Sequence, residues 1–412
     1  MHTKILASPN QPPSPVQADI SSISSTRIPL IDILRGYALF GIFLVRMVEV
    51  YSGWTTGKAS TLPTAHTDML LHQLVAFFAI GKFRALFSLL FGLSFYLQLQ
   101  NFEQKGLSFT QNFLKRLGVL FLFGLAHTYL LWSGDILRWY AFAGLILIPL
   151  YKLPTRALFF VGAVLVVVPN IAEDLYHQLS VHTTSAKPDE ALAVYTLTST
   201  HSYWEMLKAN FIIVNAEWMN FVANLCHVLV ITGYFLLGVW VGRLQLFIPG
   251  QWKKQYLEHK KEIFKLAIVL FSATIIAGII TVGALVYSGV SIKSLFAQDG
   301  LFRVILFHSK TPFIVLSHIV GVYVLLQIPF LQKQLSVLAY AGRMTLTNYI
   351  MQSMFGILIF YGIGLGLWGT VGPTYCIPLT LGLFLLQVWG SKLYLSYFKS
   401  GPLEYIWRIL LR

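Results

Sequence analysis

Residues 28–51 read IPLIDILRGYALFGIFLVRMVEVY, an apolar stretch that is long enough to cross a lipid bilayer. A transmembrane helix needs about 20 apolar residues to cross about 30 Å of hydrocarbon. The charged residues of this stretch are Asp32, Arg35, Arg46 and Glu49. At about 100° per residue they fall within a sector of about 100°, so one face of the predicted helix is ionic.

This ionic face has two interpretations. An unpaired charge at the bilayer centre costs at least about 2.5 kcal/mol, so the face is expected to point into a helix bundle. In the structural interpretation, Asp32 pairs with Arg35 and Arg46 pairs with Glu49 near the membrane ends. In the functional interpretation, Asp32, Arg35 and Arg46 bind a substrate.

The whole chain has the composition of a membrane protein. Of its 412 residues, 56% are hydrophobic and 11% are charged, against about 45–50% and about 25% in soluble domains. The formal net charge is +14, but the basic residues lie in short loops between apolar runs, which is typical of topology signals and not of nucleic-acid binding. Cys226 and Cys376 lack CxxC spacing, so the sequence predicts neither a disulfide framework nor a structural metal site.

Apolar runs bounded by charges, Pro or Gly predict an all-α bundle of about ten transmembrane helices. The predicted spans are residues 29–51, 82–100, 113–133, 135–151, 156–172, 222–245, 265–288, 311–330, 344–367 and 374–395. A further apolar run, residues 68–80, is too short to cross alone, and we interpret it as an interfacial or re-entrant helix. With a cytoplasmic N-terminus, nineteen of the 30 lysines and arginines fall on the inner side and seven on the outer side, which predicts that both termini are cytoplasmic.

The same pattern divides the chain into five parts. They are a disordered cytoplasmic tail (1–27), a first transmembrane region of about five spans (28–172), an extracytoplasmic loop with an interfacial helix (173–221), a second transmembrane region of about five spans (222–398) and an amphipathic tail (399–412).

Chemistry inside the predicted spans depends on a few polar residues. His127 lies near the outer end of the third span, and imidazole exchanges a proton near neutral pH, which makes this residue a candidate general base or proton carrier. Asp135 follows two helical turns later. The structural alternative is a histidine that is hydrogen-bonded to a neighbouring carbonyl.

Other polar residues are candidates for binding. Glu217, Asn220, Asn224 and His227 share one helical face around the sixth span. This stripe predicts either the lining of an aqueous pocket or the wet face of an interfacial helix. Asn348 begins the ninth span, where neutral polar residues often join helices to each other. The remaining histidines lack HExxH or HxH spacing, so no metal site is predicted, and no phosphate-binding loop or GxSxG motif occurs.

Five stretches together resemble the YeiB-like family of uncharacterised bacterial multipass membrane proteins. They are IDILRGYALFGIFLVRM (31–47), GKFRALFSLLFGLSFYL (81–97), GLAHTYLLWSGDILRWYAFAGLIL (124–147), LLGVWVGR (236–243) and GRMTLTNYIMQSMFGILIFYGIGLGLWG (342–369) with GPLEYIWR (401–408). The resemblance carries over Asp32, Arg35 and Gly36 of a D-x-x-R-G motif, the FSLLFG motif at 87–92, His127, Gly134 and Asp135, and residues 342–348. At Arg46 this sequence departs from the family, where Asn is expected.

The D-x-x-R-G span is also similar to that of the transmembrane acyltransferase superfamily, which includes the heparan-alpha-glucosaminide N-acetyltransferases. This similarity implies an enzyme in which acyl-CoA is the donor substrate and no cofactor is tightly bound. A cytoplasmic acyl-CoA would place its anionic part against Arg35 and the basic inner loops. His127, oriented by Asp135, would activate a hydroxyl or amine of a small-molecule, glycan or lipid acceptor near the outer face. About 15 Å or more of depth would separate Arg35 from His127.

Two other hypotheses stay open. In a proton-coupled transporter, the ionic face of the first span and the polar stripe of the sixth would line a path, and His127 would titrate. In a non-catalytic scaffold or lipid-binding protein, every buried charge would be structural. The family resemblance implies a bacterial inner-membrane location, with the lipid bilayer as a partner, and the sequence does not predict the oligomeric state. The residues predicted to bind substrate are Asp32, Arg35, Arg46, Glu217, Asn224, His227 and Asn348, with His127 and Asp135 as the predicted catalytic residues.

Overall fold

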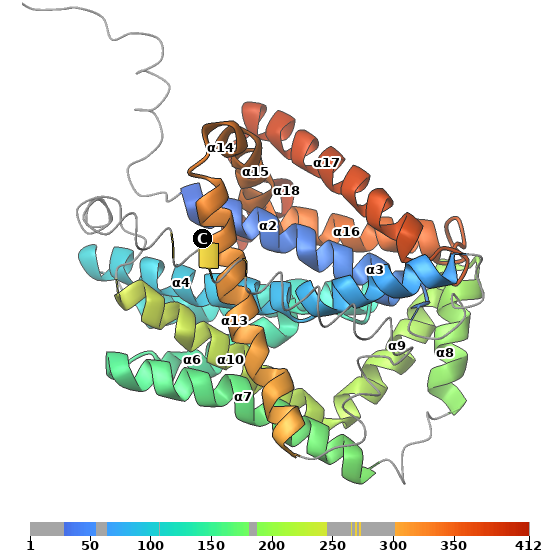
Figure 1. The fold of residues 1–412 in the computed structure, drawn as a ribbon, viewed down its shortest axis with the longest axis horizontal. Helices are drawn as coiled ribbons and strands as arrows, with labels where there is room; N and C mark the ends of the chain where they lie inside the picture. Colours follow the sequence, from blue (N-terminus) through green and yellow to red (C-terminus); the bar gives the residue numbers. More distant parts are fainter. Residues whose placement is uncertain are drawn as a thin grey trace, which may run out of the picture.

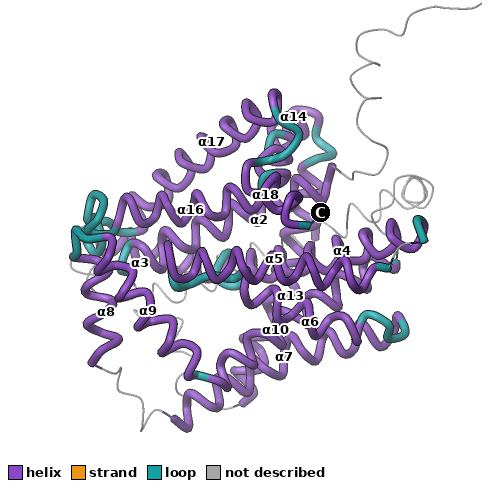
Figure 2. Tube along the Cα trace, turned by 180° about the vertical axis from the view of Figure 1, so that it is seen from behind, coloured by secondary structure: helices purple, strands orange, loops and turns teal. Residues whose placement is uncertain are grey.

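The structure is a computed structural model that describes residues 29–54, 64–106, 108–180, 188–244, 265, 268–269, 272 and 301–411. Within these residues every regular element is a helix, which confirms the predicted all-α class (Figure 2). The first half of the chain contributes α2 (Pro29–Val45), the π-helix η1 (Arg46–Tyr51), α3 (Ala65–Phe78), α4 (Lys82–Gln104), α5 (Phe109–Leu130), α6 (Leu137–Leu150) and α7 (Thr155–Ser180). The second half contributes α8 (Pro188–Ser199), α9 (Tyr203–Met219), α10 (Phe221–Arg243), α13 (Leu301–Leu325), α14 (Pro329–Ser336), α15 (Leu338–Arg343), α16 (Thr345–Phe360), α17 (Pro373–Tyr397) and α18 (Pro402–Leu410).

Several of these helices can cross a membrane, so the chain is a multipass membrane protein. Five helical segments are long and apolar enough, namely His66–Gln104, Phe109–Leu130, Thr155–Glu173, Phe221–Arg243 and Pro373–Tyr397. A sixth is possible if Lys310–Leu325 and Pro329–Arg343, which meet at 115°, form one broken span. The predicted span 265–288 lies almost entirely outside the described residues. The number of ten spans and the cytoplasmic termini therefore stay predictions.

The predicted interfacial helix 68–80 corresponds to α3, which runs on into α4 across a break at Gly81. Gly81 has a φ of 78°, a left-handed conformation that glycine adopts without strain. The two helices together cover 39 residues, or about 58 Å at 1.5 Å per residue, which is more than one crossing requires.

The helix α2 lies inside the bundle, between two groups of helices (Figure 1). It packs against α15, α16 and α17 on one side and against α4 on the other, where α4 in turn contacts α10. Its closest neighbour is α15: a Cβ on Gly36 would overlap the backbone carbonyl of Leu338, and a Cβ on Gly342 would overlap that of Asp32. The glycines of both motifs are therefore needed because two helix backbones touch.

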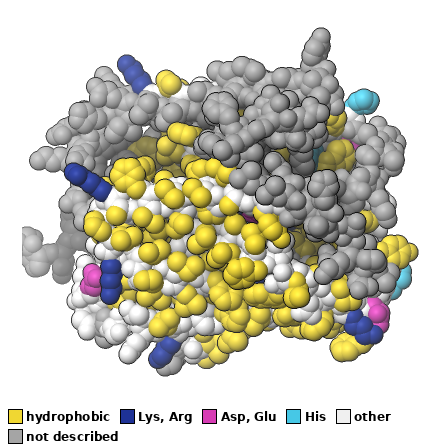
Figure 3. Space-filling view, turned by 90° about the horizontal axis from the view of Figure 1, so that it is seen from below, with side chains coloured by type: hydrophobic (Ala, Val, Ile, Leu, Met, Phe, Trp, Pro, Cys, Tyr) yellow, Lys and Arg dark blue, Asp and Glu magenta, His cyan; other side chains and the backbone are white. Residues whose placement is uncertain are grey.

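The outer surface of the bundle suits contact with lipid. Figure 3 views the molecule from below Figure 1, and it shows hydrophobic side chains over most of the described face with charged side chains near its margins. The helix α7 contributes exposed hydrophobic residues along its length, among them Phe160, Val164 and Val168. An exposed apolar area of this kind marks a membrane-facing surface.

The polar stripe predicted around the sixth span differs in the structure, because the helix is broken at Asn220. The Asn220 side chain accepts a hydrogen bond from the backbone N–H of Ala223 and caps α10. Asparagine is one of the best N-cap residues, so the chain ends α9 here and starts a new helix. Glu217 therefore belongs to α9, which pairs with α8 at one end of the bundle (Figure 1), whereas His227 belongs to α10.

Candidate active site

Three side chains from separate segments form a hydrogen-bonded chain inside the bundle. His127 lies near the end of α5, Asp135 lies in the α5–α6 connection and Ser353 lies on α16. The Nδ1 atom of His127 is 2.8 Å from Oδ1 of Asp135, and its Nε2 atom is 2.8 Å from Oγ of Ser353. His127 is 2% exposed, Asp135 3% and Ser353 0%. The structure thus brings together the two predicted catalytic residues and adds a serine that sequence reasoning missed.

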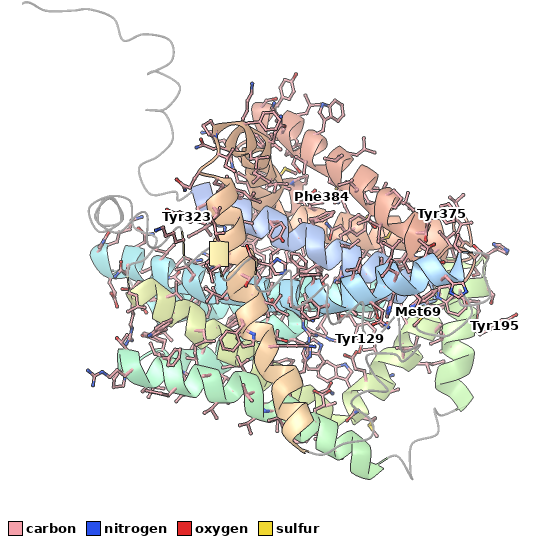
Figure 4. All side chains as sticks on the ribbon, viewed as in Figure 1. Met69, Tyr129, Tyr195, Tyr323, Tyr375 and Phe384 are labelled. Atoms are coloured by element: carbon pink, nitrogen blue, oxygen red, sulfur yellow. The ribbon has the colours of Figure 1, made fainter. Side chains whose placement is uncertain are left out.

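The local sequence explains why His127 and Asp135 meet. The carbonyl of His127 accepts hydrogen bonds from the N–H groups of Leu131 and Trp132, where α5 ends. The chain then folds back against α5, because Gly124 has no side chain: a Cβ there would overlap the backbone nitrogen of Arg138. Tyr129, labelled in Figure 4, marks this end of α5.

The hydrogen bonds determine which atoms of His127, Asp135 and Ser353 carry protons. A carboxylate accepts only, and Asp135 already accepts the backbone N–H of Arg138 on Oδ2 at 2.9 Å. The Nδ1 atom of His127 therefore carries the proton and donates to Asp135. In the neutral imidazole the Nε2 atom is then an acceptor, and the hydroxyl of Ser353 donates to it.

Arg46 joins this chain from η1. Its Nη1 atom donates to Oγ of Ser353 at 3.2 Å, and its Nη2 atom donates to the hydroxyl of Tyr349. The guanidinium lies 4.4 Å from the ring centroid of Trp132 and 4.2 Å from that of Tyr349, within the range of cation–π contacts. Two hydroxyls and two aromatic rings thus hold one cation beside His127.

The predicted ion pair between Arg46 and Glu49 is not formed. The chain from Arg46 to Tyr51 is a π-helix, whose wider i→i+5 turn changes the angles expected for an α-helix. Instead, Oε1 of Glu49 lies 2.5 Å from Nε2 of His72. The predicted pair of Asp32 and Arg35 does form, with Nη1 of Arg35 at 3.2 Å from Oδ1 of Asp32.

Tyr349 links the hydrogen-bonded chain to its surroundings. Its hydroxyl accepts the N–H of Ile136 at 3.1 Å and donates to Oδ1 of Asp135 at 3.4 Å. It lies on α16 one helical turn before Ser353, so the two side chains share a face of that helix.

Glu217, predicted to bind substrate, instead forms a half-buried ion pair, in which its own side chain is 35% exposed. Its carboxylate binds the guanidinium of Arg138, whose side chain is 0% exposed. Trp139 and Trp218 flank that guanidinium at 4.8 and 5.3 Å from their ring centroids. The pair joins α9 to α6 next to Asp135 and lines neither of the two cavities described below.

The first cavity, of about 640 Å³, lies between α2, α4, α5, α6, α15, α16 and α18. We call it the arginine cavity, because Arg35, Arg116, Arg343 and Arg408 line it. Two predicted binding residues, Asp32 and Arg35, belong to this lining. Farther along, Ile136, Tyr140 and Tyr349 line it as well. Because the Tyr349 hydroxyl contacts Arg46 and Asp135, the arginine cavity ends against the hydrogen-bonded chain of His127.

The second cavity, of about 560 Å³, is lined from α3, α4, α7, α10 and α13. We call it the lysine cavity, because Lys82 and Lys310 line it together with Arg84 and the predicted binding residue His227. Nδ1 of His227 lies 3.4 Å from Nη1 of Arg84. Met69, labelled in Figure 4, lines the same cavity from α3.

Hydrogen bonds of Tyr140 connect the walls of the two cavities. Ser88 lines the lysine cavity and Tyr140 lines the arginine cavity. The Oγ atom of Ser88 is 2.7 Å from the hydroxyl oxygen of Tyr140. The cavities therefore approach each other near the start of α6, which follows directly after Asp135.

Two further residues that were predicted to bind substrate have structural contacts. The side-chain amide of Asn224 donates to the carbonyl of Glu217 at 2.8 Å. The amide of Asn348 donates to Oγ of Ser391 at 2.9 Å and to the carbonyl of Ala341 at 3.3 Å, which joins α16 to α17 and α15. Neither asparagine lines the arginine cavity or the lysine cavity.

Comparison with known proteins identifies both halves of the chain. Residues 27–187 match the family described as heparan-alpha-glucosaminide N-acetyltransferase, catalytic, and residues 251–412 match the family described as protein of unknown function (DUF418). His127 and Asp135 thus fall in the first match and Ser353 in the second.

The curated relatives are similar over almost their whole length. The chain is 28% identical over 401 residues to Uncharacterized protein YxaH of Bacillus subtilis (strain 168), with 94% of each chain covered. It is 29% identical over 405 residues to Uncharacterized protein YeiB of Escherichia coli (strain K12), with 92% of this chain and 95% of YeiB covered. No solved structure is significantly similar. The chain is therefore similar over almost its whole length to the YxaH and YeiB proteins, and its N-terminal part is similar to the N-acetyltransferase catalytic domain.

Proposed function

We propose that this protein is a transmembrane acyltransferase, which moves an acyl group from a cytoplasmic acyl-CoA to a hydroxyl or amine of an extracytoplasmic acceptor. The observation that carries the proposal is the hydrogen-bonded pair of His127 and Asp135, placed at the end of a cavity lined by arginines. A histidine whose second nitrogen is held by a carboxylate is oriented to accept a proton. The similarity of residues 27–187 to an N-acetyltransferase catalytic domain supports the same chemistry.

The arginine cavity suits the donor. Acyl-CoA carries several phosphate charges, and arginine binds phosphate oxygens through two parallel N–H donors. Four arginines line this cavity, whereas its carboxylates are Asp32, which pairs with Arg35, and Glu404, which accepts the N–H of Leu346 at 2.8 Å. Positive charge is therefore in excess among the lining residues.

The spacing between Arg35 and Arg46 suits the pantetheine arm of the donor. Arg35 and Arg46 lie eleven residues apart on α2 and η1, or about 16 Å at 1.5 Å per residue. Phosphates bound near Arg35 would therefore leave the thioester close to the wall formed by Tyr349. The acyl-CoA itself would therefore span the difference in membrane depth that the sequence predicts between Arg35 and His127.

The lysine cavity suits the acceptor. Its lining includes Lys82, Arg84 and Lys310 against the carboxylate of Glu49, so positive charge is in excess and favours an acceptor that carries an anionic group. The contact of Ser88 with Tyr140 lies where this cavity meets the arginine cavity. Transport along the same residues would need a continuous path, and no comparison points to it.

The experiment is acyl-CoA binding and turnover by the full chain in detergent. Acetyl-CoA binding is followed by calorimetry, and release of free CoA thiol reports turnover. Arg116→Gln is expected to weaken donor binding about tenfold, because one charged hydrogen bond is worth about 1.5 kcal/mol. His127→Ala is expected to bind the donor and to lose turnover. The matched control is Arg156→Gln, since Arg156 is exposed at the start of α7 and lines neither cavity.

The outcomes separate the hypotheses. Absence of binding at millimolar acetyl-CoA would contradict the donor assignment. Equal turnover by His127→Ala and the unmodified protein would contradict the role of the histidine. A loss of binding in Arg156→Gln as large as that in Arg116→Gln would show that the effect of charge is unspecific.

A further inference from the structure

We propose that Ser353 carries the acyl group as a covalent ester between donor and acceptor. This inference rests on the proposed acyl transfer for the identity of the group that Ser353 receives. The nucleophilic character of Ser353 is a separate claim, and it rests on the contacts of its hydroxyl.

The geometry is that of a nucleophile, a base and an orienting carboxylate. Oγ of Ser353 is 2.8 Å from Nε2 of His127, and Nδ1 of His127 is 2.8 Å from Oδ1 of Asp135. The tautomer fixed by Asp135 leaves Nε2 free to accept the hydroxyl proton. This arrangement of serine, histidine and carboxylate recurs on unrelated folds and is recognised by its geometry.

The hydroxyl of Ser353 differs from those of two other buried helical serines, Ser88 and Ser94. Ser88 donates to the carbonyl of Arg84 at 2.9 Å, and Ser94 donates to that of Leu90 at 2.5 Å, four residues earlier in each case. This bond to the preceding turn is the usual way in which a helical serine satisfies its proton. Within the described part of the chain, the hydroxyl of Ser353 instead contacts side chains from α5 and η1.

Arg46 supplies the positive charge that such a nucleophile needs. Its Nη1 atom lies 3.2 Å from Oγ of Ser353, so it can stabilise negative charge as it develops on that oxygen or on the carbonyl oxygen under attack. The guanidinium is brought there by a π-helix, a local geometry that is frequent at functional sites.

The reaction balances with the groups named. Oγ of Ser353 attacks the thioester carbon as its proton passes to Nε2 of His127, the C–S bond breaks, and the proton passes on to the CoA sulfur. In the second half, the acceptor hydroxyl or amine attacks the ester carbon and gives its proton to His127. The C–O bond to Ser353 then breaks, and His127 returns the proton to Oγ.

Access to Ser353 is controlled by Tyr349. Tyr349 lines the arginine cavity and Ser353 follows it by one turn on the same face of α16, so the serine lies directly behind the cavity wall. Rotation of the Tyr349 ring away from Asp135 would open the cavity to the hydroxyl. The closed wall keeps water away from an ester intermediate.

The first experiment traps the ester on the full chain. Protein in detergent is mixed with acetyl-CoA without acceptor, quenched in acid, digested and mapped by mass spectrometry. We expect one acetyl group on the peptide that contains Ser353, and a burst of up to one CoA per protein. Ser353→Ala is expected to lose both, whereas Ser391→Ala, which removes another buried helical serine, is expected to keep both.

The second experiment needs no acyl-CoA. A fluorophosphonate probe, which reacts with activated serines, is expected to label Ser353 in the unmodified protein and to label His127→Ala at least a hundredfold more slowly. Labelling without any acetyl-CoA reaction would support the nucleophile and overturn the proposed donor. Acetyl-CoA turnover by Ser353→Ala at the unmodified rate, or an acetyl group mapped to another residue, would overturn the inference and leave the proposed function standing.

Discussion

The substitution Asp135→Asn isolates the role of the carboxylate, because the structure dictates which way the new amide must point. One oxygen of Asp135 accepts the backbone N–H of Arg138 at 2.9 Å, and the other faces Nδ1 of His127 at 2.8 Å. If the asparagine NH₂ faced Arg138, a buried N–H would lose its acceptor, at a cost of about 1–3 kcal/mol. The NH₂ group is therefore expected to face His127.

This orientation reverses the histidine tautomer. An amide that donates to Nδ1 makes that atom an acceptor, so the imidazole proton moves to Nε2 and points at Ser353. Nε2 can then no longer accept a proton. In Ser-His-Asp enzymes the same change lowers turnover about 10⁴-fold. We expect a loss of about 10³- to 10⁴-fold, or about 4–5.5 kcal/mol at about 1.36 kcal/mol per factor of ten.

The assay compares release of CoA thiol from acetyl-CoA with the thermal unfolding of the same detergent samples. In the expected orientation the hydrogen bonds to Arg138 and His127 are retained, and the long one from the Tyr349 hydroxyl, at 3.4 Å, loses its acceptor. The melting temperature should therefore fall only slightly, and donor binding should be unaffected. Asp135→Ala serves as the second variant, since it removes both acceptors and should lower stability as well as turnover. Turnover of Asp135→Asn within a factor of three of the unmodified protein would refute the reasoning, as would a variant that binds no donor.

Three other substitutions test the packing and the charges around the site. Gly36→Ala is expected to destabilise the protein by about 1–3 kcal/mol, because its Cβ would overlap the backbone of α15. The control is Gly382→Ala, whose Cβ would meet no neighbouring atom within 4 Å. Equal melting temperatures of the two variants would contradict the predicted overlap. Glu217→Gln should cost about 1–2 kcal/mol, because the fully buried Arg138 loses the charge of a carboxylate that is itself 35% exposed and partly screened by solvent; an unchanged thermal unfolding curve would argue against the pair. Arg46→Lys should retain the fold but slow CoA release at least tenfold, because an ammonium cannot donate to two hydroxyls while stacked between two rings, and full activity would contradict this.

The sequence singles out the polar residues of the site better than it predicts how they assemble. His127 and Asp135 stand out because few residue types can exchange or orient a proton inside an apolar span, and the structure places them in direct contact. Ser353 is separated from His127 by 226 residues. Serine is common in transmembrane helices, so no local pattern distinguishes this hydroxyl from one that bonds to its own helix.

Two sequence predictions failed because they assumed an unbroken α-helix. The angles that paired Arg46 with Glu49 hold for 3.6 residues per turn, whereas η1 is a π-helix. The stripe from Glu217 to His227 required one helix, whereas Asn220 caps a new one. In both places the local sequence is compatible with a continuous α-helix and with an interrupted one, and only tertiary contacts decide which of the two forms.

The position of the site also bears on how the two family matches relate. The first match supplies His127 and Asp135, while the second supplies Ser353 and Tyr349 from α16. The arginine cavity is divided in the same way, because Arg35 and Arg116 come from the first match and Arg408 from the second. Since α2 packs directly on α15, α16 and α17, the two matched regions share one core. An N-terminal fragment that ends before α13 would keep His127 and Asp135 but lack the serine, part of the cavity and the packing of α2, so we expect it to bind donor weakly and to form no ester. Catalysis would then be a property of the closed bundle and not of the acetyltransferase-like region alone.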